Sequence, residues 1–340
     1  MLATVLAGIA RYASGVPRVL AFVLAALALA GDAWIVSTAT EQVGRRYGPA
    51  VTGMLQSTLG NLPEFFVVLF ALEAGQRIVA ETAILGSIFV NALLVLGLVI
   101  VAGAWQERDR VMRFSPRLPN DTATLLLVSS FIIVLIGLVN GSHAPASQHD
   151  RTISIVGAGA LLIVYGVWTA QYLRTDQRPE AEAADDLRVP MATSLTLLVV
   201  AGAASAFVSD WFVNALEPTI SALHISQSFA GLVIVAIAGN AVENVAGIAL
   251  AHKGRHDLAI SVVKNSVAQI AAFLYPLLVI VSLLTATALT FALAPVYIGG
   301  LIGTAIIVWQ ITGDGEATPF EGTALIAAFI ILATVAWFEP

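Results

Sequence analysis

Long apolar segments follow one another along almost the whole chain, with only short polar loops between them. Each segment is about 20 residues long, the length that a helix needs to cross the hydrocarbon core of a bilayer. Hydrophobic residues make up 58% of the 340 residues and charged residues only 11%, which is too little polar surface for a soluble globule of this size. The sequence therefore predicts an all-α integral membrane protein in contact with the lipid bilayer.

The apolar segments number ten, five on each side of a polar linker. We expect transmembrane helices near residues 17–43, 50–72, 78–104, 120–140, 151–174, 190–216, 226–251, 257–285, 288–310 and 320–338. Residues 1–16 form a short segment whose apolar opening is too short to span a bilayer. The chain then continues as a first five-helix repeat (17–174), an acidic linker (175–189) and a second five-helix repeat (190–340).

One motif occurs once in each half, as Gly-Asn-Leu-Pro-Glu at residues 60–64 and as Gly-Asn-Ala-Val-Glu at residues 239–243. The same shift of 179 residues, without a gap, also pairs Gly75 with Gly254 and Ser87 with Ser266. Because five is an odd number, two similar five-helix halves must enter the membrane in opposite directions. This is the inverted-repeat plan of many secondary transporters, whose substrate site lies near the midplane.

Each copy of the motif places a glutamate, Glu64 or Glu243, inside an apolar segment. A charged side chain near the bilayer centre costs at least a few kcal/mol, so such acids usually mark an ion or proton pathway. Glycine allows close approach of an ion or a backbone, and we expect Pro63 to loosen the helical ladder beside Glu64 by removing an amide. Carboxylate, amide and carbonyl oxygens are the ligands of Ca²⁺, and two glutamates match its charge.

Two empty carboxylates in a dry site are electrostatically unfavourable, so each is expected to take up a proton when the cation leaves. Competition between protons and a divalent cation follows from this argument. The same pair of glutamates also suits sodium ions, and charge counting leaves that alternative open.

The first motif, extended to Phe66, and the stretch LGSIFVNALLVLG at residues 85–97 resemble the first repeat of the calcium/proton antiporters of the cation/calcium exchanger superfamily. The second motif, with the polar residues that follow it, is similar to the partner repeat, and the resemblance covers nearly the whole chain from about residue 17. It implies that Glu64 and Glu243 bind the ion. It also implies that the surrounding ligands are Asn61, Asn240, Ser87, Asn91, Ser266 and Gln269.

The second repeat departs from the family pattern at three positions. Asn244 stands where the family usually has a histidine that could help to carry protons, and Lys264 and Asn265 stand where it has Leu-Gly. Two interpretations of Lys264 are open. Its long side chain snorkels to the headgroups, or its ammonium group pairs with a site carboxylate such as Glu243 and changes the ion stoichiometry.

Further acidic residues lie in the equivalent first and sixth spans, namely Asp32, Glu41, Asp210 and Glu217. The resemblance implies that these two spans are the moving, gating pair. Either a proton relay or a hydrogen-bonded packing role fits these acids.

Basic residues are distributed unequally between the two sides of the membrane. Four arginines lie on the amino-terminal side, and eleven basic residues lie on the other side: Arg45, Arg46, Arg108, Arg110, Arg113, Arg117, Arg174, Arg178, Arg188, Lys253 and Arg255. By the positive-inside bias the second side is cytoplasmic. We therefore predict a protein of the cytoplasmic membrane with both termini outside.

Taken together, these features predict a secondary active antiporter that exchanges cytoplasmic Ca²⁺ for protons by alternating access. A sodium-coupled calcium or cation exchanger is one alternative, and a cation channel or a non-transporting cation-binding sensor is another. We expect no enzymatic activity and no cofactor, because no nucleotide-binding loop or nucleophile motif occurs in a suitable context. The net charge of −6 and the absence of a basic stripe give no indication of nucleic-acid binding.

Overall fold

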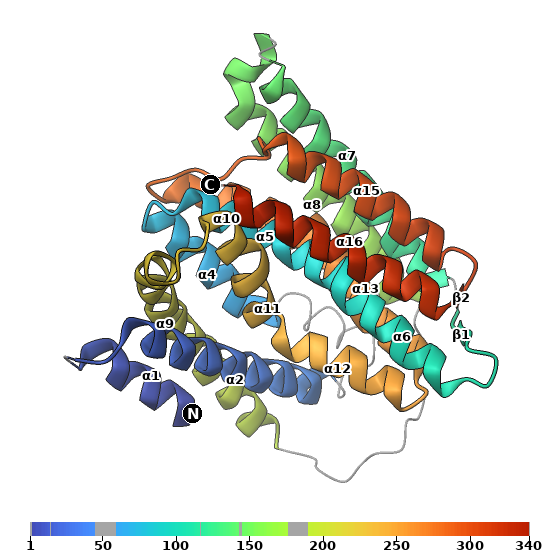
Figure 1. The fold of residues 1–340 in the computed structure, drawn as a ribbon, viewed down its shortest axis with the longest axis horizontal. Helices are drawn as coiled ribbons and strands as arrows, with labels where there is room; N and C mark the ends of the chain where they lie inside the picture. The colour runs from blue at the N-terminus through green and yellow to red at the C-terminus, as the bar shows by residue number, and fades with distance from the viewer. Residues whose placement is uncertain are drawn as a thin grey trace. The chain divides into compact units, whose positions relative to one another are not determined.

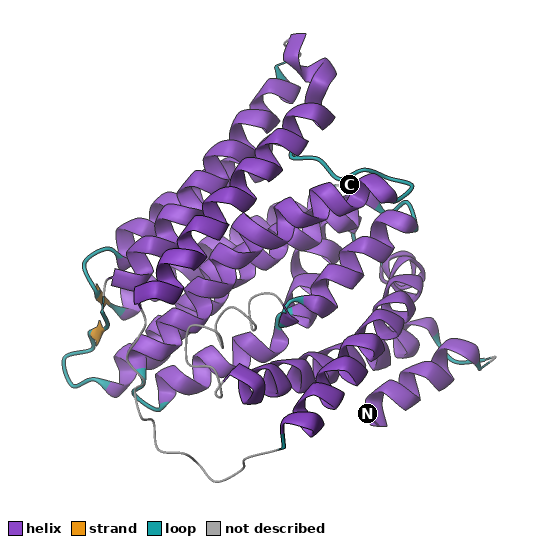
Figure 2. Ribbon diagram, turned by 180° about the vertical axis from the view of Figure 1, so that it is seen from behind, coloured by secondary structure: helices purple, strands orange, loops and turns teal. Residues whose placement is uncertain are grey.

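The computed structural model describes residues 2–13, 15–44, 59–115, 117–142, 145–175 and 190–339. These residues are almost entirely helical, apart from two short antiparallel strands, β1 (Met112–Arg113) and β2 (Glu316–Ala317) (Figure 2). Within the described residues, eight helices are long and apolar enough to cross a membrane, and one bent pair makes a ninth span. The all-α membrane class is confirmed. Residues 176–189 of the acidic linker and residues 50–58 of the second predicted span lie outside the described residues.

The helices follow the predicted order of spans (Figure 1). Those of the first half are α1 (Leu2–Tyr12), α2 (Arg18–Gly44), α4 (Leu62–Glu73), α5 (Arg77–Phe89), α6 (Leu96–Gln106), α7 (Arg117–Gly141) and α8 (Asp150–Thr175). Those of the second half are α9 (Met191–Leu223), α10 (Gln227–Phe229), α11 (Ala236–Gly239), α12 (Ala241–His252), α13 (His256–Gln269), α14 (Tyr275–Val281), α15 (Pro295–Thr312) and α16 (Pro319–Phe338). Short 3₁₀ turns occur at η2 (Pro145–His149) and η5 (Ser282–Leu284).

The chain forms two compact units, and each unit combines segments of both sequence halves. The first unit comprises Met1–Phe70 and Ile163–His224, and the second comprises Ala71–Leu162 and Ile225–Pro340. In the first unit α2 packs along α9, and the rings of Phe22 and Phe212 lie 4.7 Å apart. The first and sixth spans, which occupy equivalent places in the two halves, therefore form one packed pair.

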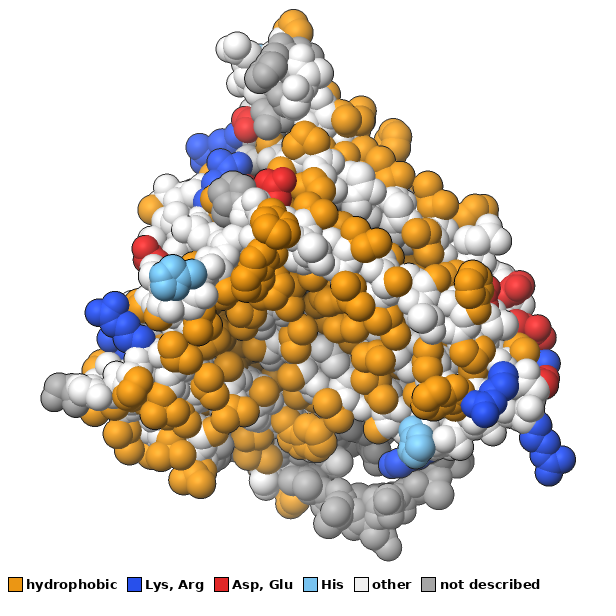
Figure 3. Space-filling model, viewed as in Figure 1, with side chains coloured by type: hydrophobic (Ala, Val, Ile, Leu, Met, Phe, Trp, Pro, Cys, Tyr) orange, Lys and Arg blue, Asp and Glu red, His pale blue; other side chains and the backbone are white. Residues whose placement is uncertain are grey.

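The second unit contains the most deeply buried helices. The most apolar stretch of Arg77–Gln106 is 83% buried within the protein, whereas the corresponding stretch of Met191–Leu223 is 22% buried. Hydrophobic side chains also cover much of the visible surface, and charged side chains form small groups there (Figure 3). Because lipid can cover apolar surface, such exposure is expected for a membrane protein. The buried α5 and α6 instead face other protein segments.

The duplication is visible in the backbone as well as in the sequence. Gly75 and Gly254 adopt nearly identical left-handed conformations, with φ of 74° and 73°, which glycine adopts without steric cost. The amide of Gly75 donates to Leu72 and that of Gly254 donates to Ala251. The next amide in each turn follows the same pattern. The amide of Gln76 donates to the carbonyl of Ala71, and the amide of Arg255 donates to the carbonyl of Leu250, which lies 179 positions after Ala71. Both turns are therefore built by the same hydrogen bonds.

Among the described residues, three π-helical segments interrupt the predicted spans: η1 (Val90–Val95), η3 (Ala230–Val235) and η4 (Ile270–Leu274). The first follows α5 and the third follows α13, which are equivalent helices of the two repeats. Such segments are rare and frequently occur at functional sites. The hydrophobic pattern gave no sign of them, because a π segment keeps the apolar composition of its helix.

Two predicted spans differ from the structure. The span at 226–251 is not one helix, because it bends by 63° between α11 and α12. The span at 288–310 begins later, at Pro295, and residues 285–294 are not helical. In this stretch hydroxyl side chains take the place of helical backbone bonds, as where the Ser282 hydroxyl accepts from the Leu289 amide. An apolar composition alone does not reveal such a change.

Gly86 allows a close approach between α5 of the first half and η3 of the second half, both in the second unit. A Cβ atom at this position would overlap the backbone of Leu232 in η3. We expect Gly86→Ala to lower stability by about 1–3 kcal/mol, because overpacking displaces backbone. Thermal unfolding of the purified protein in detergent measures this effect. Gly159→Ala is the matched control, because nothing lies within 4 Å of its Cβ position, and an unchanged midpoint for Gly86→Ala would contradict the close approach.

Candidate ion-binding site

The helix break in the second half occurs at Asn240, between α11 and α12. Its backbone carbonyl accepts from the amide of Asn244 at 3.0 Å, and its side-chain nitrogen donates to the carbonyl of Ala236 at 3.0 Å. In the first half the carbonyl of Asn61 accepts from the amide of Phe65 at 2.9 Å. Both motifs therefore begin a new helix at their asparagine.

Both motif glutamates occupy the third position of the helix that begins there, Glu64 in α4 and Glu243 in α12. The free amides at a helix start carry partial positive charge, which favours an ionised carboxylate. Glu64 is only 4% exposed. Pro63 lies in the first helical turn, where the missing amide is not needed, so it begins a helix and does not loosen one.

Side chains from both sequence halves meet in the second unit. The Asn240 Nδ2 donates to the Ser87 Oγ at 2.8 Å, and the Asn91 Nδ2 donates to the Asn240 Oδ1 at 3.1 Å. The Asn91 Nδ2 also donates to the carbonyl of Ser87 at 3.0 Å. All three residues are at most 3% exposed. The structure thus brings together three of the predicted ligands.

Several buried side-chain oxygen atoms of the second unit have no hydrogen-bond partner within the described part of the chain. They are Asn91 Oδ1, Glu243 Oε2, Asn244 Oδ1 and Asn265 Oδ1. Ser266 lies beside the Glu243 carboxylate. Buried polar atoms are nearly always paired, so a group of unpaired oxygens requires an explanation. Oxygens of this kind can act as ligands of a hard cation such as Ca²⁺.

The remaining predicted ligands are also buried. Gln269 ends α13 and is 8% exposed, in the second unit. Asn61 directly precedes α4 in the first unit and is 5% exposed. In that unit the Ser209 hydroxyl of α9 donates to the carbonyl of Pro63 at 3.3 Å. This bond joins the sixth span to the start of the helix that carries Glu64.

Lys264 is buried and does not reach the protein surface, with 3% of its area exposed. Its Nζ donates to the Thr312 Oγ1 at 2.5 Å, and Thr312 in turn donates to the carbonyl of Val308. Thr312 ends α15, where the last carbonyls carry partial negative charge and favour a cation. The snorkelling interpretation is therefore wrong. Sequence gave no signal for Thr312, since threonines at helix ends are common.

The other acids of the first unit differ in their surroundings. Asp32 of α2 is fully buried and accepts from the Thr4 hydroxyl of α1 at 3.2 Å. Asp210 accepts from Asn214 on its own helix at 2.9 Å, and Glu217 is exposed. The side chain of Glu41 lies outside the described residues. A relay role for these acids stays a prediction.

The fold and the duplicated, oxygen-rich helix starts define a class, the secondary transporters built from two inverted repeats. The sequence matches the family described as "Sodium/calcium exchanger protein" over residues 18–172 and 193–338, so the chain belongs to this family. It is 27% identical to the Ca(2+)/H(+) antiporter of Aphanothece halophytica, covering 94% of this chain and 90% of the relative. It is also 27% identical to the Ca(2+)/H(+) antiporter ChaA of Bacillus subtilis (strain 168), covering 93% and 92%.

The fold agrees with that of a solved structure. The chain superposes on native YfkE with a TM-score of 0.81 at 24% sequence identity, covering 99% of this chain and 96% of that chain. This likeness shows that the two proteins share a fold.

Asn240 forms hydrogen bonds with Ser87 and Asn91, so its substitution is expected to lower the thermal stability of the protein. Asn240→Ala leaves buried polar groups unpaired, which costs about 1–3 kcal/mol for a neutral group. Differential scanning fluorimetry of the purified protein checks this. Asn214→Ala, at an exposed position paired only within α9, is expected to leave the midpoint unchanged. Equal midpoints of thermal unfolding for Asn240→Ala and Asn214→Ala would contradict the role of Asn240 in holding Ser87 and Asn91.

Proposed function

We propose that this protein exchanges Ca²⁺ for protons across a membrane, the activity that the names of its relatives state for them. The observation that carries the proposal is the pair of glutamates at the third position of two equivalent helices, Glu64 buried and Glu243 half-buried with an inaccessible Oε2. The unpaired oxygens of Asn91, Glu243 and Asn244 support it. A site of this composition suits a cation that accepts many oxygen ligands in a tolerant geometry.

In this proposal the carboxylates of Glu64 and Glu243 neutralise the double charge of Ca²⁺. Neutral oxygens from the first half (Asn61, Ser87 and Asn91) and from the second half (Asn240, Ser266 and Gln269) complete the ligand set. When the ion leaves, desolvation favours the protonated form of each carboxylate. Protons and Ca²⁺ then compete for the same oxygens, which couples their movement.

Alternating access requires one part of the protein to move relative to the site. The packed pair of α2 and α9 in the first unit is the moving part in this proposal. The hydrogen bond between Ser209 and Pro63 gives that pair a direct link to the helix start at Glu64. Following the positive-inside bias, we further propose a cytoplasmic membrane location, outward-facing termini and export of Ca²⁺ from the cytoplasm.

Neutralising either glutamate tests the proposal. Glu64→Gln and Glu243→Gln are each expected to abolish exchange, because the amide keeps the shape but cannot release a proton or supply a negative charge. The measurement is radiolabelled Ca²⁺ uptake into proteoliposomes under an imposed proton gradient. Glu73→Gln, at an exposed position at the end of α4, is the matched control and should transport like the unmodified protein.

Three outcomes would contradict the proposal. Uptake that survives collapse of the proton gradient but requires a sodium gradient would indicate sodium coupling. Uptake without saturation or counter-ion would indicate a channel. Full transport by Glu64→Gln or Glu243→Gln would remove that carboxylate from the site.

Lys264 is proposed to weaken cation binding. It lies two residues before Ser266 on α13, and a buried positive charge opposes a divalent cation nearby. Lys264→Leu is therefore expected to lower the KM for Ca²⁺ severalfold in the same uptake assay. Lys253→Leu removes the same charge from an exposed position and should not. An unchanged or higher KM for Lys264→Leu would contradict this role.

A further inference from the structure

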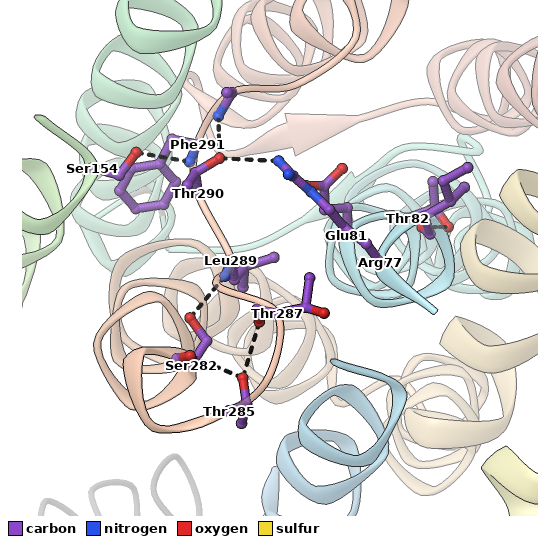
Figure 4. Close-up of polar contacts among 12 residues, drawn as sticks. Arg77, Glu81, Thr82, Ser154, Ser282, Thr285, Thr287, Leu289, Thr290 and Phe291 are labelled. Carbon is purple, nitrogen blue, oxygen red and sulfur yellow. Dashed lines mark hydrogen bonds and ion pairs between the residues drawn. The ribbon is translucent and has the colours of Figure 1, made fainter. Parts of the chain in front are cut away.

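Residues 285–294 of the second unit form a non-helical segment that is partly buried inside the protein. Leu289, Thr290 and Phe291 are 1%, 5% and 0% exposed. Non-helical backbone within a membrane protein needs partners for its amides and carbonyls. Side chains supply them, because the Phe291 amide donates to the Ser154 hydroxyl at 3.1 Å and the Leu289 amide donates to the Ser282 hydroxyl at 2.8 Å (Figure 4).

Arg77, the first residue of α5, joins this segment to the helix. Its Nη2 donates to the Thr290 Oγ1 at 3.3 Å, while its Nε donates to the Glu81 carboxylate at 2.7 Å (Figure 4). The Tyr275 hydroxyl donates to the Thr290 carbonyl at 3.0 Å. Thr290 is therefore held through both its side chain and its backbone. We call Arg77, Glu81 and Thr290 the Arg77 clamp.

Local helix energetics do not explain the Arg77 clamp. A cation at the amino end of a helix faces the positive end of the helix dipole. An acidic residue four positions before a basic one stabilises a helix better than the reverse order, and here the order is reversed. Arg77 is thus in an unfavourable place for α5 itself. Its contact with Thr290, 213 residues away in the chain, supplies a reason for its position.

The Arg77 clamp lies on the helix that carries two proposed ligands. α5 runs without interruption from Arg77 to Phe89 and contains Ser87, and Asn91 follows in η1. Further along α5, Thr82 and Gly86 lie directly against the backbone of η3, the segment that precedes α11 and Asn240. A shift at the start of α5 therefore moves Ser87 and Asn91 relative to Asn240.

The Arg77 clamp has no copy in the second repeat. The residues that correspond to Arg77 and Glu81, 179 positions later, are His256 and Ile260. The His256 Nδ1 lies 3.8 Å from the Oε1 of Glu107, the residue that directly follows α6. The turns before α5 and α13 are otherwise built alike. The Arg77 clamp is therefore a feature added to one end of the duplicated core.

We propose that Arg77 is a positioning residue for Ca²⁺ binding, because it fixes the start of α5 between Glu81 and Thr290 and so sets Ser87 and Asn91. This inference rests on the proposed function. The guanidinium group is suited to the task, since its planar fork can hold two partners at once, whereas the ammonium group of lysine acts as a point charge.

The test uses full-length protein with the variants Arg77→Gln, Arg77→Lys and Thr290→Val. Two quantities are measured, the Kd of Ca²⁺ by isothermal titration calorimetry in detergent, and KM and Vmax in proteoliposomes. Arg77→Gln and Thr290→Val are each expected to raise Kd and KM roughly 3- to 10-fold with Vmax little changed, the scale of one lost hydrogen bond. The double variant of Arg77→Gln and Thr290→Val should bind Ca²⁺ no more weakly than Arg77→Gln alone. The Kd and KM of Arg77→Lys should lie between those of Arg77→Gln and those of the unmodified protein.

Arg113→Gln is the matched control. Arg113 also forms ion pairs, with Asp109 at 2.7 Å and Glu316 at 3.2 Å, but it is more than half exposed and belongs to β1. Its substitution should leave Kd and KM unchanged. A lower unfolding temperature for Arg77→Gln with unchanged Kd would show a purely structural role and overturn the proposal. Additive effects of Arg77→Gln and Thr290→Val would also overturn it.

Failure of this inference is distinguishable from failure of the proposed function. If Glu243→Gln loses Ca²⁺ binding while Arg77→Gln binds like the unmodified protein, only the role of Arg77 is refuted. If Glu243→Gln binds Ca²⁺ normally, the proposed site itself is refuted.

Discussion

A helix that begins inside a membrane leaves amides and carbonyls that only the protein can satisfy. This constraint governs the second unit. At the break the backbone amide and the side chain of Asn240 both donate to the Ala236 carbonyl, and the same side chain donates to Ser87 and accepts from Asn91. One residue therefore ends a helix, begins the next and positions two helices of the other half. The new helix start places Glu243 where the helix dipole favours a carboxylate.

The polar core of the second unit contains more acceptors than donors. The side-chain amides of Asn91 and Asn240 donate to protein oxygens, while Asn91 Oδ1, Glu243 Oε2 and Asn244 Oδ1 have no partner among the described residues. Such an excess of oxygens is costly unless a cation or protons bind there. A surplus of this kind explains how one site can exchange a metal ion for protons, because either occupant supplies the positive charge that the oxygens require.

Much of the fold was predictable from the sequence, because bilayer thickness and the shift of 179 residues are strong constraints. The shift even predicts the matching turns at Gly75 and Gly254. Other features depend on contacts between distant residues. The non-helical segment before Pro295 has the composition of a helix, and its partners Ser154 and Arg77 lie in the other half. The partner of Lys264 is likewise a threonine 48 residues away, which no local pattern indicates.

Competition of Ca²⁺ and protons for the same carboxylates has a direct consequence in solution. Proton release can be measured when Ca²⁺ is added to the purified protein in weakly buffered detergent solution. We expect protons to be released in proportion to the Ca²⁺ bound, and we expect Glu64→Gln and Glu243→Gln each to lose this release. Stoichiometric binding of Ca²⁺ with no proton release at any pH would refute the competition.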